Sequence, residues 1–271
     1  MLQKIEETAA FLKSIQTVNP KIGIILGTGL GGLVNEITPQ KIIDYSEIPN
    51  FPISTVEGHH GRLIFGTIKG VPIVAMQGRF HFYEGYDMQQ VTFPVRVMKM
   101  MGIDYLIVSN ASGGLNPDFK VGDIMIIDDH INMFGNNPLL GKNIAEFGPR
   151  FPDMSQPYNK ELIVKALKIA EAENIELKQG VYVGTSGPTF ETPAEYKFFR
   201  IIGGDAVGMS TVPEVIVARH ADMTCFGISI ITDSGVPGQI VEISHEEVQE
   251  VARAAEPKMT KIIARLVEGI R

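Results

Sequence analysis

The sequence predicts an α/β fold in a single domain, and three observations support that prediction. Short β-rich apolar runs alternate with stretches of helical periodicity along the chain, which is typical of α/β domains. The chain has 271 residues, 44% of them hydrophobic, so it can bury one sizeable core. Neither a Ser/Pro/Gly-rich linker nor a run of charge marks a boundary, so residues 1–271 are expected to form one domain.

The first half of the chain is expected to contain more strands than helices. An amphipathic helix opens it and ends at Asn19-Pro20, and the two strands around Lys69-Gly70 carry a hairpin signal. Turn residues are frequent in segment 132–158. The expected elements are a helix at 2–18, strands at 22–26, 41–45, 62–68 and 71–76, a helix at 88–101, and strands at 103–109 and 123–127.

The second half is expected to contain several helices that begin with the same signal. Thr192-Pro-Ala-Glu195 and Thr211-Val-Pro-Glu214 each place a threonine three residues before a glutamate, the pattern of a capping box, and Ser244 precedes a glutamate in the same way. Several strands run into Gly- or Ser-rich loops at their C-terminal ends, where an open α/β sheet binds ligands. The expected elements are helices at 159–173, from 192, from 211 and at 244–269, and strands at 177–184 and 223–232.

Composition and charge argue against several classes of protein. The formal net charge of -7 argues against nucleic acid as the main partner, because a polyanion needs a basic surface. The single cysteine, Cys225, lies in an apolar run and is expected to be a core residue. No apolar run approaches the length of a membrane span and no signal-peptide pattern opens the chain. We therefore expect a cytoplasmic protein with no membrane partner.

A glycine-rich loop, Gly27-Thr-Gly-Leu-Gly-Gly32, follows the strand expected at 22–26. Its spacing satisfies G-x-G-x-x-G, and Asp44 stands about where a ribose-binding acid would, so the loop suggests a dinucleotide-binding dehydrogenase. However, the next strand begins too soon for the helical crossover of roughly a dozen residues that a parallel pair requires. We therefore favour an anion site in which backbone N–H groups and the Thr28 hydroxyl hold a phosphate, with a plain turn as the alternative.

The segment Gln77-Gly-Arg-Phe-His-Phe-Tyr-Glu-Gly-Tyr86 gathers the most informative polar side chains. If the preceding strand continues, Arg79, His81 and Tyr83 point to one face. Arginine binds phosphate through a planar fork of donors, and histidine adds a donor that titrates near neutral pH. The three side chains predict an oxyanion site, and a solvated strand end with a surface ion pair is the alternative.

Polar groups also occur at other turns and strand ends. Gly58-His-His-Gly-Arg62 is cationic, but adjacent histidines rarely bind one metal ion and no third ligand has suitable spacing, so we predict no metal site. Loop 110–116 offers backbone N–H groups to an anion, or forms an ordinary turn. Asp233 follows the last strand at the edge where ligands bind, and a turn-initiating aspartate is its alternative. His245 lies in the first turn of the last helix, where an exposed residue is the simpler interpretation.

Together these motifs resemble those of the trimeric purine nucleoside phosphorylases. Eight of them occur in the family's order, which is far more specific than one glycine loop. The resemblance implies a central mixed β-sheet flanked by helices, a homotrimer, and reversible phosphorolysis of purine nucleosides to free base and ribose 1-phosphate. The motifs are segments 27–32, 58–62, 77–86 and 110–117, with Arg150-Phe-Pro-Asp-Met-Ser, Gly187-Pro-Thr-Phe-Glu-Thr, Val207-Gly-Met-Ser-Thr-Val-Pro-Glu and Ser244-His-Glu-Glu-Val.

The resemblance also implies a role for each matching residue, with inorganic phosphate as co-substrate and no other cofactor. The implied phosphate ligands are Thr28, Arg79, His81, Ser210 and the backbone N–H of Ala111, with His59 beside them. The implied nucleoside ligands are Tyr83, Met209 and His245 at the ribose, Phe190 and Glu191 at the base, and Phe151 in a neighbouring subunit's site. Glu84 is implied to orient His81, and the implied catalytic residues are His81, Glu191 and Asp233.

Asp233 is the place where the chain departs from the family's pattern. Members that use 6-oxopurines typically carry asparagine there, whose amide donates to O6 and accepts from N7–H. An ionised aspartate only accepts, which suits a 6-amino group, whereas a protonated one can still donate to O6. The related methylthioadenosine phosphorylases have aspartate at this place but generally lack the acid at Glu191 and the imidazole at His245.

Two positions thus favour 6-oxopurines and one favours adenine. Glu191 can accept from N1–H and from the 2-amine of guanine, which adenine does not offer. We predict inosine and guanosine, with their deoxy forms, as the main substrates and some activity with adenosine. A phosphorylase that prefers methylthioadenosine or adenosine is the main alternative. A nucleoside hydrolase and a non-catalytic nucleoside-binding protein are the others.

Overall fold

The computed structural model describes residues 1–27, 30–53 and 60–270. Across these residues nine strands form one sheet in the order β2-β3-β4-β1-β5-β8-β7-β6-β9. β1 pairs in parallel with β4 and β5, whereas β2 and β3 are antiparallel, so the sheet is mixed as predicted. The strands are β1 (Ile22–Leu26), β2 (Thr38–Asp44), β3 (Arg62–Ile68), β4 (Val71–Gln77), β5 (Tyr105–Gly114), β6 (Ile124–Asn132), β7 (Leu177–Gly184), β8 (Ala206–Gly208) and β9 (Thr224–Ser234).

Part of the sheet closes on itself. β9 pairs with β6 on one side and with β5 on the other, so β5, β8, β7, β6 and β9 form a ring of paired strands. β1, β4, β3 and β2 continue from β5 as an open sheet. Because β5 pairs with both β8 and β9, the C-terminal part of β5 lies between two other strand ends, and this is where ligand-binding side chains are expected.

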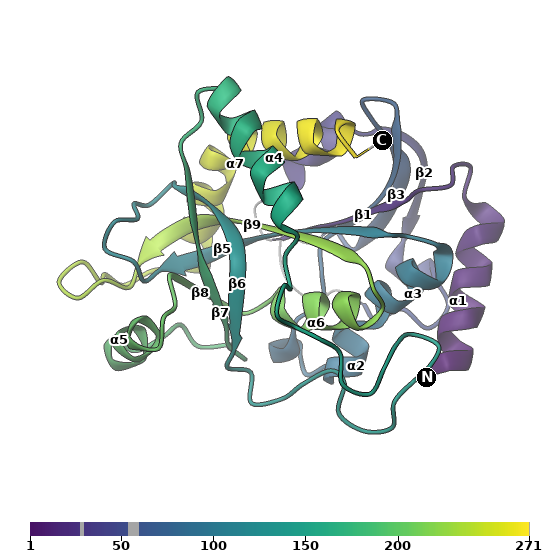
Figure 1. Cartoon of the computed structure of the whole chain (residues 1–271), viewed down its shortest axis with the longest axis horizontal. Coiled ribbons are helices and arrows are strands. Elements are labelled where there is room, and N and C mark those ends of the chain that lie inside the picture. The colour runs from purple at the N-terminus through teal and green to yellow at the C-terminus, as the bar shows by residue number, and fades with distance from the viewer. Residues whose placement is uncertain (28–29, 54–59, 271) are drawn as a thin grey trace.

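Helices cover both sides of the sheet (Figure 1). α7 packs on β9 and against α4 on one side, while α6 packs on β9 and against α3 on the other, with α1 next to α3. None of the helices in the described part of the chain is long and apolar enough to cross a membrane. The helices are α1 (Leu2–Ile15), α2 (Met88–Val91), α3 (Phe93–Met101), α4 (Lys160–Ala172), α5 (Pro193–Ile201), α6 (Val212–His220) and α7 (His245–Glu268).

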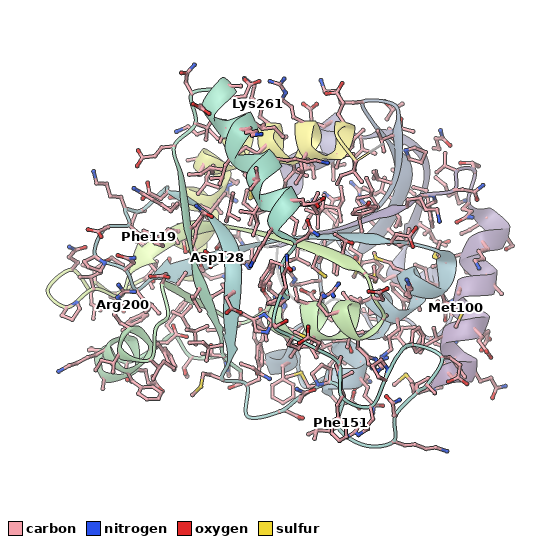
Figure 2. The ribbon with its side chains drawn as sticks, in the orientation of Figure 1. Met100, Phe119, Asp128, Phe151, Arg200 and Lys261 are labelled. Atoms are coloured by element: carbon pink, nitrogen blue, oxygen red, sulfur yellow. The ribbon has the colours of Figure 1, made fainter. Side chains whose placement is uncertain are left out.

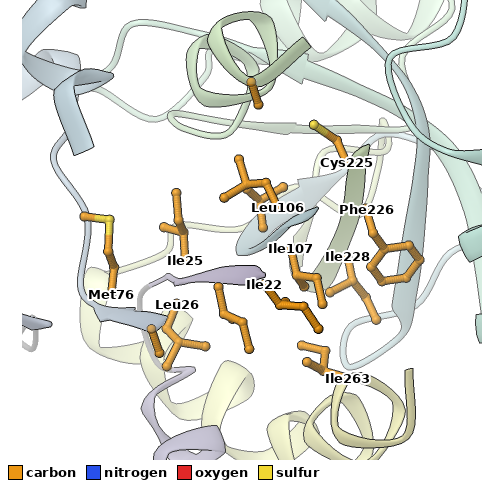
Figure 3. Packing of buried hydrophobic residues seen from close by; sticks show 14 of the residues in the cluster. Ile22, Ile25, Leu26, Met76, Leu106, Ile107, Cys225, Phe226, Ile228 and Ile263 are labelled. Carbon is orange, nitrogen blue, oxygen red and sulfur yellow. The ribbon is translucent and has the colours of Figure 1, made fainter. Parts of the chain in front are cut away.

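The main hydrophobic core lies where β1, β5 and β9 run side by side (Figure 3). Ile22 of β1 and Phe226 of β9 lie on the side of the sheet where Ile263 of α7 packs, whereas Leu106 of β5 points to the opposite side. All five residues of β1 are buried, as expected for a parallel strand covered on both faces. Cys225 is buried in this core as predicted, and burial raises the pKa of its thiol to about 12.

Most elements lie close to their predicted positions, but several boundaries differ. β2 begins at Thr38, three residues early, and β6 continues to Asn132, five residues beyond the expected end. The helix expected at 88–101 is divided at Thr92, because Pro94 has no N–H to donate and the Thr92 hydroxyl donates to the Met88 carbonyl at 2.7 Å. The first helix ends at Ile15, three residues early. The strand expected at 103–109 continues to Gly114, because residues 110–114 pair with β9. The prediction of a loop from 110 was therefore wrong.

Capping boxes open α5 and α7, as predicted. The Glu195 backbone N–H donates to the Thr192 hydroxyl, and the Thr192 N–H donates back to the Glu195 carboxylate. Ser244 and Glu247 exchange the same two hydrogen bonds. Each box satisfies two N–H groups that a helix start otherwise leaves without a partner.

The connection after the glycine-rich loop is not a dinucleotide-binding crossover. A 3-10 helix, η1 (Gly31–Glu36), leads to β2 at the edge of the sheet, three strand positions from β1 along the pairing order. The parallel neighbours of β1 are β4 and β5. The rejection of the dehydrogenase hypothesis is thereby confirmed.

A β-bulge lies near the end of β9. Ser112 of β5 pairs with Ile231, but Gly113 pairs with Asp233, so Thr232 is an extra residue on β9. Bulges turn a strand locally and are common beside functional sites. A Cβ on Gly113 would lie 2.8 Å from Asp233 Oδ2. The bulge and the glycine together make room for the Asp233 carboxyl group at this strand end.

At Gly27, just after β1, the backbone approaches β5 so closely that a side chain would not fit without movement. A Cβ there would lie 2.8 Å from the Ser109 carbonyl oxygen and 2.9 Å from Arg79 Nη1. We expect Gly27→Ala to lower the free energy of unfolding by about 1–3 kcal/mol through overpacking. Urea denaturation at one fixed protein concentration measures it. Gly31→Ala is the matched control, since its Cβ would meet Gln77 Nε2 at an ordinary 3.5 Å; equal losses in the two variants would contradict the prediction.

Candidate active site

The ends of β5, β8 and β9 border a hollow of about 650 Å³, a volume that includes the part open to solvent. This is within the size range of small-molecule sites. The fold therefore gathers side chains that are spread over more than half of the sequence. Ten of the predicted site residues line the hollow: Arg79, His81, Tyr83, Ala111, Phe190, Glu191, Met209, Ser210, Asp233 and His245.

The chain turns sharply after β4, and this turn brings the first three of these residues to the hollow. β4 ends at Gln77, and Gly78 has φ 102°, a conformation that residues with a side chain rarely adopt. The 3-10 helix η3 (Phe82–Glu84) follows. The predicted continuation of the strand was therefore wrong, although the predicted grouping of the three side chains is correct.

A buried ion pair holds the Arg79 side chain. Arg79 is 1% exposed and Glu214, on α6, is 3% exposed. Nε and Nη2 of Arg79 each donate to one Glu214 carboxylate oxygen at 3.0 Å, and Nη1 donates to the Ser109 carbonyl at 2.6 Å. A bidentate pair constrains both the position and the plane of the guanidinium. Arg79 thus meets the hollow in one defined orientation.

Glu214 was predicted to form a capping box with Thr211, and that prediction is wrong. Thr211 has φ 70° and ψ -54° and makes no capping hydrogen bond. The Val212 N–H donates to the Ser210 carbonyl at 2.7 Å, which closes a γ-turn of the rare, strained hand. Asn110 Nδ2 supports this turn by donating to Thr211 Oγ1 at 2.8 Å. The turn presents Ser210 to the hollow at the start of α6.

His81 lies between Glu84 and Tyr83. Its Nδ1 is 3.1 Å from Glu84 Oε1, and its ring stacks on that of Tyr83 with centroids 4.7 Å apart. Because a carboxylate only accepts, Nδ1 carries the proton in this hydrogen bond. Burial lowers the pKa of His81, although the hydrogen bond to Glu84 opposes the shift. The imidazole is therefore neutral at pH 7, and its Nε2 is an acceptor.

Ala111 reaches the hollow from within a strand. It pairs with Ile230 of β9, so the strand ladder sets its position. Asn110 and Ser112 beside it also line the hollow, although neither was predicted to. The predicted anion-binding loop is replaced here by a strand end with polar side chains.

Two carboxyl groups, Glu191 and Asp233, line the same hollow. The Thr185 hydroxyl donates to Glu191 at 3.2 Å, while Thr232 and Tyr196 donate to the two Asp233 oxygens at 2.9 and 3.4 Å. Burial raises the pKa of both carboxyl groups, and the charge of Asp233 adds to the increase at Glu191. Both groups therefore hold a proton more readily than they would in water.

Three predicted site residues remain. Thr28 and His59 lie outside the described residues. Phe151 (Figure 2) is 86% exposed on a loop. It borders a separate hollow on the surface. Its predicted contact with a neighbouring subunit stays a prediction. Within the ranges that the structure describes, no group of three or more His, Cys, Asp or Glu is arranged to hold a metal ion.

Three residues that shape this geometry were not predicted to do so. Glu214 has the spacing of a capping glutamate, and the sequence signal for another role is that it stands among apolar residues in α6. Asn110 was considered only for its backbone. Tyr196 lies on the buried face of the amphipathic helix α5, where a hydroxyl needs a partner and finds Asp233.

Comparison with known sequences matches residues 21–268 to the phosphorylase superfamily. Purine nucleoside phosphorylase 1 of Bacillus subtilis is 54% identical over 267 residues, which are 98% of this chain and 98% of that protein. The purine nucleoside phosphorylase of Rattus norvegicus is 50% identical over 272 residues, covering 98% of this chain and 94% of the rat protein.

Solved structures agree with the sequence comparison. Schistosoma mansoni purine nucleoside phosphorylase in complex with adenosine has a TM-score of 0.95 and 41% identity, and the match covers 100% of this chain and 98% of that one. A schistosoma purine nucleoside phosphorylase in complex with hypoxanthine has a TM-score of 0.94 at 41% identity, with the same coverage. The chain therefore belongs to the phosphorylase superfamily and, within it, to the purine nucleoside phosphorylase family.

Proposed function

We propose that the protein is a purine nucleoside phosphorylase, which moves the pentose of a purine nucleoside onto phosphate. The bond from C1' to the base nitrogen breaks, a bond from C1' to a phosphate oxygen forms, and the base leaves with the electron pair. The observation that carries this proposal is a single hollow that combines phosphate-type donors with two carboxyl groups. The names of the closely similar relatives support it.

Arg79 and Ser210 are the proposed phosphate donors, together with the Ala111 backbone, Thr28 and His59. Bond cleavage builds positive charge on the pentose, and a phosphate held beneath C1' stabilises that charge through donors that need not move. Ser210 precedes α6, whose N-terminal end carries partial positive charge. The Nε2 atom of neutral His81 accepts, so a phosphate that still carries a proton can donate to it.

Glu191 and Asp233 are the proposed base ligands, with Phe190 as an apolar wall. Negative charge builds on the departing base, and a carboxyl group that retains a proton can donate to it. Tyr83, Met209 and His245 are the proposed ribose ligands. Burial raises the pKa of Tyr83 to about 12, so its hydroxyl keeps its proton and can donate.

The proposed main substrates are inosine, guanosine and their deoxy forms. Glu191 can accept from N1–H of a 6-oxopurine, and His245 offers a polar wall suited to a 5'-hydroxyl. His245 Nε2 already lies 2.9 Å from Gln249 Nε2, so this part of the hollow is polar. A methylthio group would lose its apolar surroundings there. A preference for methylthioadenosine or adenosine is the alternative, because an ionised Asp233 accepts a hydrogen bond from a 6-amino group.

The finer properties of the enzyme are part of the same proposal. Phosphate is the co-substrate, and no other cofactor takes part. The active form is a homotrimer in which Phe151 enters a neighbouring subunit's site, and the enzyme works in the cytoplasm. The exposure of Phe151 supports the trimer, because burying such a side chain in an interface contributes about 1.5–3 kcal/mol.

The proposed reaction requires phosphate. We expect base release from inosine, guanosine, adenosine and methylthioadenosine to depend on added phosphate, with the two 6-oxopurine nucleosides used best. Chromatography of free base and ribose 1-phosphate, with and without phosphate, measures this. Base release that is equally fast without phosphate would identify a hydrolase, and binding without turnover would identify a nucleoside-binding protein. Preference for methylthioadenosine would establish the alternative specificity.

Arg79→Lys keeps the positive charge but removes the planar fork. Lysine cannot contact Glu214, Ser109 and phosphate in the same geometry, so we expect kcat/KM for phosphate to fall roughly 10- to 100-fold, equivalent to about 1.5–3 kcal/mol for a lost charged hydrogen bond. Steady-state kinetics at saturating inosine measures it. Arg200→Lys is the matched control, because Arg200 pairs with Asp205 on the surface (Figure 2). A similar loss in both variants would contradict the role of Arg79.

A further inference from the structure

The base end of the hollow contains two carboxyl groups where one titratable acid and one amide would suffice. Glu191 and Asp233 both line the hollow, and both are half-buried. Burial raises the pKa of each, and the charge of Asp233 further raises that of Glu191. Two carboxyl groups that interact in one site titrate as a pair, and the proton that remains after one of them ionises belongs to the pair.

The two kinds of purine present opposite hydrogen-bonding patterns to these groups. A 6-oxopurine has a donor at N1 and an acceptor at O6, so it needs an acceptor at Glu191 and a donor at Asp233. A 6-aminopurine has an acceptor at N1 and a donor at its amine, so it needs the reverse. A carboxylate only accepts, whereas a carboxylic acid also donates. Each base is therefore complementary to a pair that carries a single proton.

We propose that Glu191 and Asp233 hold one proton between them, and that the position of this proton decides whether the site accepts a 6-oxopurine or a 6-aminopurine. With the proton on Asp233, the site is complementary to inosine and guanosine. With the proton on Glu191, the site is complementary to adenosine. The proton moves from one carboxyl group to the other, so the pair keeps one negative charge throughout. This inference rests on the proposed function and deepens it.

Neighbouring hydroxyl groups bias where the proton resides. A hydroxyl that donates to a carboxyl group stabilises its ionised form. Tyr196 and Thr232 donate to Asp233, whereas Thr185 donates to Glu191. Thr232 Oγ1 also reaches the Ser112 carbonyl, at 3.2 Å, so its single proton is divided between two acceptors. Tyr196 is thus a positioning residue for Asp233. Thr185 is its counterpart for Glu191, although the Thr185 hydroxyl also reaches the Gly208 carbonyl, at 3.4 Å.

The surroundings of Tyr196 keep its hydroxyl in place and protonated. Its ring is buried on α5, and a Cβ on Gly235 would lie 2.4 Å from that ring, so backbone closely covers it. Burial and the two nearby carboxyl groups raise the pKa of Tyr196, which leaves its hydroxyl a donor at any working pH. Glu195 adds a negative charge near Glu191, and His245 of α7 lines the same hollow.

Two conservative substitutions should move the specificity in opposite directions. Tyr196→Phe removes a donor from Asp233, so the proton shifts to Asp233 and the ratio of kcat/KM for inosine to that for adenosine should rise about fivefold. Thr185→Val removes the donor from Glu191, so the same ratio should fall about fivefold. Both substitutions keep the shape of the side chain. Steady-state kinetics with both nucleosides at saturating phosphate measures the ratio.

Controls separate proton position from general damage. Tyr158→Phe removes another buried hydroxyl, which contacts His130 away from the hollow, and should leave the ratio unchanged. Asp233→Asn places an amide donor at position 233 that does not titrate, so it should raise the ratio. Adding Tyr196→Phe to Asp233→Asn should then leave the ratio unchanged. Two results would overturn the proposal. One is an equal loss of kcat/KM for inosine and adenosine in Tyr196→Phe and in Thr185→Val. The other is a change of the ratio by Tyr196→Phe that is the same with and without Asp233→Asn.

The pH dependence gives an independent readout. The pair carries its shared proton below its upper pKa and loses it as pH rises through that value, so kcat/KM for both nucleosides should fall on the alkaline side. Asp233→Asn should remove this fall for inosine, and persistence of the fall would overturn the proposal. Wild-type enzyme that releases no base with phosphate would refute the proposed function itself. If base release depends on phosphate but Tyr196→Phe and Thr185→Val leave the inosine-to-adenosine ratio unchanged, only the proton-sharing inference would be refuted.

Discussion

The ion pair between Arg79 and Glu214 is the contact on which the rest of the site depends. It joins the turn after β4 to the start of α6, and the Ser109 carbonyl ties the same guanidinium to β5. Burying such a pair gains little stability over an apolar packing, yet removing one partner costs about 3–5 kcal/mol because the other charge is left unpaired. Its benefit is therefore orientation: three separate segments are held so that Arg79 meets the hollow in one geometry.

The strained turn at Thr211 is a second consequence of that arrangement. A threonine at φ 70° costs about 1–3 kcal/mol and persists only where its surroundings hold it. Here Asn110 donates to Thr211 Oγ1 and accepts from Ser229 Oγ at 2.5 Å, and the Ser229 and Ser112 hydroxyls lie 2.6 Å apart. This buried network spans β5, β9 and the turn. It sets Ser210 at the wall of the hollow, while Glu214, four residues after Ser210, reaches Arg79.

The sequence predicts the site more fully than it predicts how the site is built. Periodicity locates nearly every strand, and the ordered motifs identify ten residues that do meet in one hollow. What it misses depends on contacts between distant segments. The glutamate at 214 has the spacing of a cap, and local pattern alone cannot reveal an arginine 135 positions earlier as its partner. Segment 110–114 looks like a loop because it contains glycines and a serine. It is nevertheless a strand because it pairs with β9, and no local sequence signal predicts that pairing.

The charges of the described site explain how a protein with a net charge of -7 can bind phosphate. Arg79 is neutralised by Glu214, and His81 is neutral at pH 7 because burial lowers its pKa. The proposed phosphate ligands among the described residues therefore contribute almost no net positive charge. In this proposal, phosphate is recognised by donors aimed in set directions. At the proposed base end, the two carboxyl groups add a negative charge if they hold one proton between them as we propose. A site with this balance selects its anion by geometry, so the ion pair and the strained turn, which set that geometry, matter more to function than overall charge does.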